Sequence, residues 1–496
     1  MQSEWSCSLG MPHLAHPLSL LLLLLPHATA LTPIETAILR SERSRIFDTL
    51  TEVVDSEYKD KPIQADQFPT AHFQSREVYI EKENAHLRDV LFEGDIMAST
   101  DLLNRVLDYS LHRQEHRHRR QAFVDKDYPS TIWSRGVPYI LSDTLTESAK
   151  KSILRAIEFW QKETCIDFWE RTTEPQYLYF IGDDSGCWSA VGKELKLGPQ
   201  KISLGRGCSH FGVTSHELAH ALGLFHEQSR YDRDSHITLH ANRVSRRLLY
   251  NFAKVGTDEL DTYTLPYDVG SVMHYAPTEF ATDRSQPVLT AVDPNLQFAM
   301  GSLSGPSFID VALINEHYTC SLKCFHQLPC LNGGYTDPRN CSQCKCPSGF
   351  GGVLCDDVDA SFTTACGGTV EVGEDVRRFS IVIRQRGDEQ EKRCIYHFKA
   401  PSDRRILFNV IALDANCVEG CHLDSAEFKM VSDMRPVGYR VCCDEQKGLQ
   451  YVSMGDVVPA IFLSNRNTFR IQFEFTLYSP RRQRSAGKMR EIVVDV

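Results

Sequence analysis

The sequence lacks any apolar run long enough to cross a lipid bilayer. The run Leu20 to Leu25 is too short for that, and Ala28-Thr29-Ala30 follows it, a pattern typical of a secretory signal peptide and its cleavage site. We therefore expect residues 1–30 to be removed and the protein to be secreted, without stable membrane insertion. No lysine or arginine precedes the apolar run, so translation from Met11, which gives a more compact signal, is an alternative to translation from Met1.

The sequence also has no excess of positive charge, and no cysteine after the leader is left without a possible disulfide partner. The net charge of -11 gives no reason to expect a nucleic-acid partner. Of the 17 cysteines, Cys7 lies in the leader, and the rest form an even number, as expected for an oxidised extracellular chain. With 496 residues, the chain has room for about three domains.

The segment HELAHALGLFHEQSRYDRD, which begins at His216, carries residues at spacings suited to a zinc site. On a helix, His216 and His220 lie on one face and can share a metal ion, while Glu217 lies beside the metal and can take a proton from water. Gly223 can adopt a positive φ, end the helix and direct His226 to the same ion. Three imidazoles leave one coordination position of zinc open for a water molecule. Zinc lowers the pKa of this water to about 7 and polarises a substrate carbonyl, so the pattern indicates peptide-bond hydrolysis. The alternative is an amphipathic helix with ordinary surface or core histidines.

This segment resembles the signature of the astacin metallopeptidases, a branch of the metzincins in which glutamate and an RxDRD-like sequence follow the third histidine. Downstream, SVMHY from Ser271 to Tyr275 is similar to the family's Met-turn. The resemblance implies that Met273 forms an apolar floor beneath one Zn²⁺ ion and that Tyr275 stabilises negative charge on the substrate carbonyl oxygen. Without the zinc motif, SVMHY would equally fit the end of a buried strand. The resemblance thus implies a zinc metalloendopeptidase.

For the fold, the resemblance implies an α+β metzincin catalytic domain over residues 121–320, with a mixed sheet, a backing helix, an active-site helix and an irregular C-terminal half. Apolar residues at helical spacing within 146–164 predict the backing helix. Residues 177–181 and 201–204 are typical of strands. In this family, the edge strand near the loop at 186–189 binds an extended substrate by strand addition.

Two further modules are expected after the catalytic domain. Residues 321–356 contain six closely spaced cysteines and resemble an EGF-like module. So short a segment cannot form a large core and needs disulfides to be stable. Residues 366–478 show period-two alternation, as in 405–410 and 469–475, which indicates an all-β sandwich. Together with Cys366-Gly367-Gly368, this region resembles a CUB domain.

The family resemblance also implies most of the disulfide pairs. Adjacent cysteines rarely bridge each other, so Cys442 and Cys443 are each expected to bond to Cys417 or Cys421, with the pairing left open. The implied pairs are Cys165 with Cys320, Cys187 with Cys208, Cys324 with Cys341, Cys330 with Cys344, Cys346 with Cys355, and Cys366 with Cys394.

Two surface features complete the C-terminal half. Residues 479–496 are expected to be a disordered, initially basic tail, in which the run 481–484 is either a solvated linker or a processing site. Asn340-Cys341-Ser342 fits the acceptor pattern for N-glycosylation.

Residues 31–120 are interpreted as a propeptide. The basic run that ends at Arg120 fits a proprotein convertase site, so cleavage would expose Gln121; the alternative is an exposed basic stretch. Phe92-Glu93-Gly94-Asp95 resembles the family's aspartate switch, in which Asp95 takes the open metal position and displaces water. An aspartate in an ordinary glycine turn is the alternative.

In astacins the new amino terminus folds toward the glutamate after the third zinc histidine, here Glu227. The arm that begins at Gln121 is longer than in the family, and an N-terminal glutamine can cyclise and lose its charge. We therefore assign Glu227 a structural role and leave its contact with the mature terminus open.

Two functional classes follow. The first is a secreted zinc endopeptidase whose EGF-like and CUB modules direct it to matrix or precursor proteins. The second is a catalytically inactive binding or adhesion protein that uses the same modules, although all residues needed for catalysis are present. The domain layout is most similar to nematode astacins that act on cuticle collagen, in moulting or on eggshells; tolloid-type procollagen processing is the nearest rival.

Overall fold

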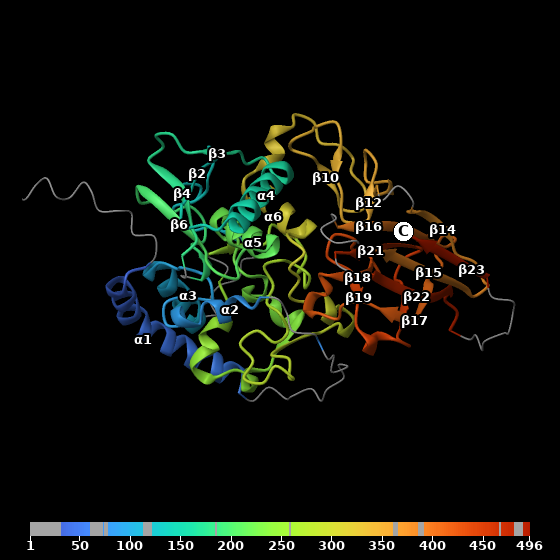
Figure 1. The fold of residues 1–496 in the computed structure, drawn as a ribbon, viewed down its shortest axis with the longest axis horizontal. Helices are drawn as coiled ribbons and strands as arrows, with labels where there is room; N and C mark the ends of the chain where they lie inside the picture. The colour runs from blue at the N-terminus through green and yellow to red at the C-terminus, as the bar shows by residue number, and fades with distance from the viewer. Residues whose placement is uncertain are drawn as a thin grey trace, which may run out of the picture.

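The computed structural model describes residues 31–59, 73, 78–112, 122–183, 186–256, 259–360, 366–384, 391–465, 468–480 and 490–496. An N-terminal helical segment, a central region and a C-terminal β region follow one another along the chain and pack side by side (Figure 1). The predicted signal peptide, Arg120, Gln121 and the basic run at 481–484 lie outside the described residues. Within the described part of the chain, no helix is both long enough and apolar enough to cross a membrane.

The N-terminal segment consists of helices that lie against the central region (Figure 1). Helix α1 (Pro33–Tyr58) begins at a capping box formed by Thr32 and Glu35 and contacts α3 (Thr100–His112). The side chain of Phe47 stacks on Tyr250 of the central region, with 4.1 Å between the ring centroids. Both parts share one apolar core, so this segment depends on the central region for its packing. The connecting elements are α2 (Ile80–Glu83) and η1 (Ala85–Leu87).

The central region is built on a five-stranded mixed sheet, in the order β3-β2-β4-β6-β5. Only the edge strand β5 runs antiparallel to its neighbour. The backing helix α4 is capped by Thr146 and packs against the active-site helix α5. The predicted α+β catalytic domain, its backing helix and both predicted strands are confirmed. The bounds are β2 (Val137–Leu141), α4 (Glu147–Glu163), β3 (Phe168–Glu170), β4 (Gln176–Ile181), β5 (Cys187–Ser189), β6 (Gly198–Leu204) and α5 (Phe211–Leu222).

The part of the central region after α5 is irregular, as predicted. It consists mainly of single 3₁₀ turns and two-stranded ladders, and SVMHY forms a turn where a strand end was the alternative. Helix α6 (Phe308–His317) closes the region. The other elements are β1 (Ala122–Phe123), which pairs with β8 (Leu260–Asp261); β7 (Ile237–Leu239), which pairs with β9 (Leu289–Ala291); and the turns η2 (Glu227–Ser229), η3 (Arg233–Ser235), η4 (Ala241–Arg243), η5 (Arg246–Phe252) and η6 (Pro294–Ala299).

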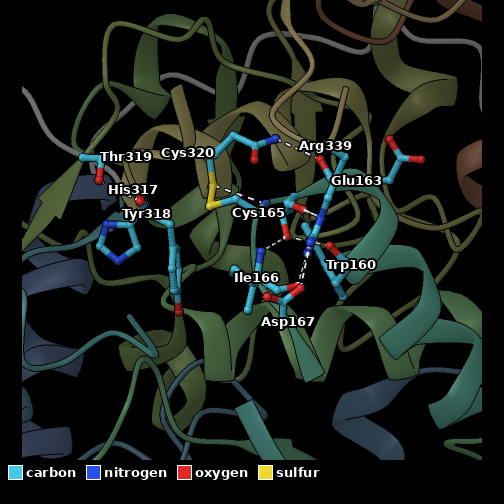
Figure 2. The surroundings of a disulfide bond; sticks show 12 residues. Trp160, Glu163, Cys165, Ile166, Asp167, His317, Tyr318, Thr319, Cys320 and Arg339 are labelled. Atoms are coloured by element: carbon cyan, nitrogen blue, oxygen red, sulfur yellow. Dashed lines mark hydrogen bonds and ion pairs between the residues drawn. A yellow bond between two sulfur atoms is a disulfide. The ribbon is translucent and has the colours of Figure 1, made fainter. Parts of the chain in front are cut away.

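A small disulfide-rich segment follows and is fixed to the central region. The Cys165–Cys320 disulfide joins the end of α4 to the start of this segment, and the Arg339 side chain lies beside it (Figure 2). Arg339 donates hydrogen bonds to the carbonyl oxygens of Thr164 at 2.6 Å and Ile166 at 2.7 Å. The segment contains η7 (Cys320–Lys323), β10 (Tyr335–Thr336), β11 (Cys344–Lys345), β12 (Phe350–Gly351) and β13 (Asp357–Val358), and the disulfides Cys324–Cys341, Cys330–Cys344 and Cys346–Cys355.

The C-terminal region contains two five-stranded sheets, ordered β14-β16-β21-β18-β19 and β20-β17-β22-β15-β23. Inward-facing phenylalanines from both sheets, among them Phe379, Phe398 and Phe473, form the buried core. The bounds are β14 (Gly368–Glu371), β15 (Arg377–Arg384), β16 (Lys392–Lys399), β17 (Ile406–Asp414), η8 (Glu419–Cys421), β18 (Asp424–Phe428), β19 (Tyr439–Val441), η9 (Asp444–Gln446), β20 (Gln450–Val452), β21 (Val457–Ser464), β22 (Thr468–Leu477) and β23 (Arg490–Asp495).

In this region the structure revises one sequence expectation and decides one pairing that the sequence left open. The prediction of a disordered tail is wrong for residues 490–496, because β23 pairs in parallel with β15 and Ile492, Val494 and Val496 pack against the core. The pairing that the sequence left open is Cys417–Cys443 and Cys421–Cys442. The structure also contains Cys187–Cys208 and Cys366–Cys394.

Candidate metal centre and active site

Helix α5 and the turn after it bring three histidines together. His216 and His220 lie one helical turn apart, and the helix ends at Gly223, whose φ is 113°. A Cβ atom at this glycine would lie 2.8 Å from His317 Nε2, so both the conformation and the space require glycine. The chain then turns and places His226 beside the other two rings, with centroids 5.0 Å from His216 and 4.8 Å from His220.

Each of the three imidazoles is oriented by a hydrogen bond at Nδ1. The acceptors are the carbonyl oxygen of Val272 for His216, at 2.8 Å, and that of Leu224 for His220, at 2.7 Å. His226 Nδ1 lies 2.8 Å from the Glu93 carboxylate. Because Nδ1 is engaged in each ring, all three Nε2 atoms are left to bind a metal. Hydrogen bonds of this kind usually orient the histidine ligands of metal sites.

The carboxylate of Asp95 lies among these Nε2 atoms. Its oxygens are 3.3 Å from His216 Nε2, 3.5 Å from His220 Nε2 and 3.3 Å from His226 Nε2. One ligand atom from each of the four residues lies within 4.8 Å of the others, and all four residues are buried. Although burial raises the pKa of Asp95, the nearby imidazoles outweigh it and hold that pKa well below its ordinary value.

The donor set fits a zinc ion. Three imidazole nitrogens and one carboxylate oxygen are the ligands that zinc prefers, and four ligands complete a tetrahedron. Among the described residues, Nε2 of His220 and of His226 has no hydrogen-bond partner, although both atoms are buried. Buried polar atoms without partners are costly, and a metal ion would satisfy them.

A tight turn presents Asp95. Phe92 and Ile96 exchange two backbone hydrogen bonds of 2.9 Å, and Gly94 between them has a φ of 80°. The flanking backbone pairs with the edge strand β5, because the Ser189 N–H donates to the Asp95 carbonyl oxygen at 3.1 Å and the Ser189 carbonyl accepts from the Met97 N–H at 2.8 Å. The segment therefore occupies the strand edge as well as the metal position.

Glu217 is fully buried, and neither of its carboxylate oxygens has a hydrogen-bond partner within the described structure. Burial, followed by the negative charge of Asp95, raises the pKa of Glu217 well above its ordinary value. The second cause comes from a residue of the N-terminal segment, so the pKa of Glu217 is higher with Asp95 in place than burial alone would make it.

The turn that carries SVMHY places Met273 and Tyr275 next to the histidines. The Ser271 hydroxyl donates to Asp310 at 2.6 Å, and the Met273 carbonyl accepts from Glu227 N at 2.9 Å. The ring of Tyr275 lies 4.9 Å from that of His226, and its hydroxyl donates to the Glu93 carbonyl oxygen at 2.6 Å. The phenol thus lies next to the three histidines, and its hydroxyl is bonded to a residue of the N-terminal segment.

Glu227 is buried and has partners from its own region. Its carboxylate accepts hydrogen bonds from Arg230 Nη1 at 3.1 Å and from the backbone N–H of Asp268 at 2.8 Å. Burial, opposed by Arg230, raises the pKa of Glu227 to about 8. Ala122, the residue after Gln121, pairs with Asp261 in the β1–β8 ladder. The contact between the mature terminus and Glu227, which the sequence left open, would involve Gln121, and this residue lies outside the described residues.

Sequence analysis missed Glu93 as a site residue. Its φ of 49° turns the side chain toward His226, while Asp95 two residues later reaches the Nε2 side. The only sequence signal was an acidic residue directly before the turn glycine, which does not reveal where the side chain points.

Comparisons with known proteins agree with this geometry. Residues 125–319 match the family model described as Astacin, a family of peptidases. Zinc metalloproteinase nas-29 of Caenorhabditis elegans is 46% identical over 455 residues, which cover 88% of this chain and 86% of the relative. Zinc metalloproteinase nas-23 of the same organism is 41% identical over 418 residues, covering 84% of this chain and 77% of the relative.

One solved structure matches part of the chain. High choriolytic enzyme 1, a hatching enzyme zinc-protease from Oryzias latipes, is 32% identical and matches 40% of this chain and 98% of its own, with a TM-score of 0.37. The sequence matches extend well beyond the zinc motif, and the predicted enzyme class and zinc cofactor are confirmed. The chain therefore belongs to the astacin family of zinc metalloendopeptidases.

Proposed function

We propose that this chain is a secreted astacin made as a zymogen, in which residues 31–120 block the zinc centre until a proprotein convertase cleaves after Arg120. The position of the Asp95 carboxylate, within 3.5 Å of all three histidine Nε2 atoms, carries this proposal. A carboxylate at this position would occupy the coordination position of the zinc ion at which the catalytic water would bind. The helices before it anchor the turn through the shared core.

In the mature enzyme, His216, His220 and His226 would hold zinc, which when bound supplies a Lewis acid that polarises the scissile carbonyl and makes water acidic. Glu217 would accept a proton from the attacking water and deliver it to the departing amine. Its burial and lack of partners favour this role, because a carboxylate without other hydrogen bonds is free to exchange protons.

Tyr275 and β5 would bind the reacting peptide. After the propeptide leaves, the Tyr275 hydroxyl no longer donates to Glu93 and can donate to the carbonyl oxygen as negative charge develops there. The backbone groups of Ser189 that now pair with Asp95 and Met97 become available to an extended substrate. The substrate would thus replace the propeptide along the same strand.

The C-terminal regions would direct the enzyme to its substrates. We assign an EGF-like domain to residues 321–356 and a CUB domain to the region that begins at residue 366. The eight disulfides support an extracellular location. Asn340 is exposed and would accept an N-glycan. Because the relatives are nematode zinc metalloproteinases, we propose matrix, cuticle collagen or eggshell proteins as substrates.

The proposal is tested with the Asp95→Asn precursor, which preserves the shape of the side chain and removes its charge. We expect this precursor to cleave an unfolded protein before processing, with activity abolished by a chelator, while the wild-type precursor stays inactive. Equal latency of both precursors would refute the proposed switch. If the processed wild-type protein also cleaves no unfolded protein, the catalytically inactive binding protein becomes the better interpretation.

A further inference from the structure

The C-terminal β region reaches the propeptide next to the active site. The Tyr79 hydroxyl donates to Glu419 Oε2 of η8 at 3.0 Å. The other oxygen of Glu419 accepts from the backbone N–H of Thr278 at 3.2 Å and from its hydroxyl at 2.8 Å. One carboxylate of the β region therefore joins the propeptide to the catalytic region.

The side chain of Arg284 lies over the ring of the same tyrosine. The guanidinium carbon of Arg284 is 3.6 Å from the centroid of the Tyr79 ring, and Arg284 also forms an ion pair with Glu81. Arg284 Nη1 donates to the Thr278 hydroxyl at 3.3 Å, so Thr278 links the cation to Glu419. These groups thus contact a tyrosine and an acidic residue two positions apart in the propeptide.

This contact surface is continuous with the zinc centre. Glu81 lines one cavity together with His216, His226 and Tyr275. Upstream, Phe73 packs on Phe298 of the catalytic region, with 5.9 Å between the ring centroids, against an apolar cluster that also contains Cys421, Cys442 and Cys443 of the β region. Phe73 and Tyr79 therefore each lie next to both the catalytic and the β regions.

Glu419 and Arg284 belong to parts of the protein that stay when the propeptide is removed. The β region is fixed to the catalytic region by hydrogen bonds from Tyr439 to Asp293 at 2.6 Å, from Arg440 to Ser302 at 2.8 Å, and from the Val437 N–H to Asp268 at 3.1 Å. Glu419 is 1% exposed. When Tyr79 is removed, the buried Glu419 carboxylate loses one hydrogen-bond donor. When Glu81 is removed, Arg284 loses the carboxylate that pairs with it. Both changes favour the binding of a new hydroxyl donor and a new carboxylate.

We propose that, in the mature enzyme, Glu419 and Arg284 form a substrate subsite that binds a tyrosine and an acidic residue two positions apart. Glu419 accepts the tyrosine hydroxyl, and Arg284 stacks on the ring and pairs with the carboxylate. The β region supplies Glu419 and the catalytic region supplies Arg284. This inference rests on the proposed removal of residues 31–120.

A peptide library digested by the activated full-length enzyme tests the subsite. Sequencing the cleaved peptides should show tyrosine and an acidic residue two positions apart, enriched about tenfold at a fixed distance from the cleaved bond, as expected for one charge-assisted contact. Digests with Arg284→Gln and with Glu419→Gln should lose this enrichment. The matched control is Arg404→Gln, which alters an exposed arginine that pairs with Glu374 in the same β region and should retain the enrichment.

The outcomes separate this inference from the proposed function. An active wild-type enzyme without the paired enrichment would overturn the subsite, and so would its retention in the Arg284→Gln digest. A wild-type digest without any cleaved peptide would instead refute the endopeptidase function. Thermal unfolding of each variant, compared with the control, verifies that a lost preference does not come from a lost fold.

Discussion

The Nδ1 atom of His226 lies 2.8 Å from the carboxylate of Glu93, while the Nε2 atom of the same ring faces Asp95 at 3.3 Å. Two carboxylates of the N-terminal segment, separated by one glycine, therefore contact both nitrogens of one histidine ring. Asp95 occupies the metal position, and Glu93 holds the ring that defines it. We infer that latency depends on both carboxylates.

Glu93 gives the first prediction. The Glu93→Ala precursor loses a buried hydrogen bond between a carboxylate and His226, which is worth about 1.5–3 kcal/mol. We expect the unprocessed variant to show roughly ten- to hundredfold more chelator-sensitive peptide cleavage than the unprocessed wild type. The control is Glu42→Ala on the exposed side of α1. A Glu93→Ala precursor as silent as this control would show that Asp95 alone maintains latency.

Glu217 gives the second prediction. The processed Glu217→Ala enzyme should bind zinc through its three intact histidines but should lose about 10²- to 10⁴-fold in kcat, because a general base is missing. Zinc content by elemental analysis and kcat on a long peptide are measured on the same sample. Full activity with bound zinc would contradict the role of Glu217, whereas loss of zinc would assign it a structural role.

The third prediction concerns the hydroxyl of Tyr275. Tyr275→Phe keeps the ring, which packs 5.6 Å from that of Phe280, and removes only the donor. We expect kcat to fall by roughly 10²- to 10³-fold with little change in KM, because the lost hydrogen bond strengthens only as the oxyanion forms. A rise in KM at constant kcat would mean that the phenol binds the substrate in its ground state.

The fourth prediction is a pH dependence in the β region. Burial by itself raises the pKa of Glu427, but Lys429 and Arg440 outweigh it and lower that pKa to about 2. A glutamate in the unfolded chain titrates near pH 4.3. The ion pairs of Glu427 therefore contribute fully to the free energy of unfolding above about pH 4.3, and this contribution is lost as the pH falls to about 2. The contribution is on the order of 3 kcal/mol. The protection factors of the amides in β18 and β19, which correct for the intrinsic pH dependence of exchange, should therefore fall across this range in the full-length protein.

Glu427→Gln is the matched variant for this measurement. It removes the charge that Lys429 contacts at 3.4 Å and Arg440 at 3.2 Å, so its strands should exchange faster than wild type at pH 7. Between about pH 4.3 and 2 the variant should change less than wild type. Parallel pH profiles for the two proteins would rule out Glu427 as the group that titrates.

Local spacing explains why the metal ligands could be predicted. A separation of four residues places His216 and His220 on one helical face in any α-helix, and Gly223 ends that helix by its own conformational freedom. The strands of the central sheet and the helix capped by Thr146 follow from equally local patterns. The position of Asp95 was expected only by resemblance, because more than a hundred residues separate it from the histidines.

Contacts between distant segments could not be predicted in this way. β23 follows a basic stretch and pairs with a strand about a hundred residues earlier, and no local pattern indicates such a partner. Cys417 and Cys421 lie close together in the sequence, and so do Cys442 and Cys443, so both pairings between them were compatible with the chain. The tertiary structure, in which η8 contacts β19, has one of the two pairings.

The sequence by itself determined the chemistry of this protein, because zinc ligands, a proton acceptor and a helix-ending glycine act through spacings of a few residues. Only the tertiary structure decided that Glu93 holds His226 and that Glu419 of the β region contacts Tyr79 of the N-terminal segment. Those contacts join residues far apart in the chain, and their geometry depends on the packing of whole regions against each other.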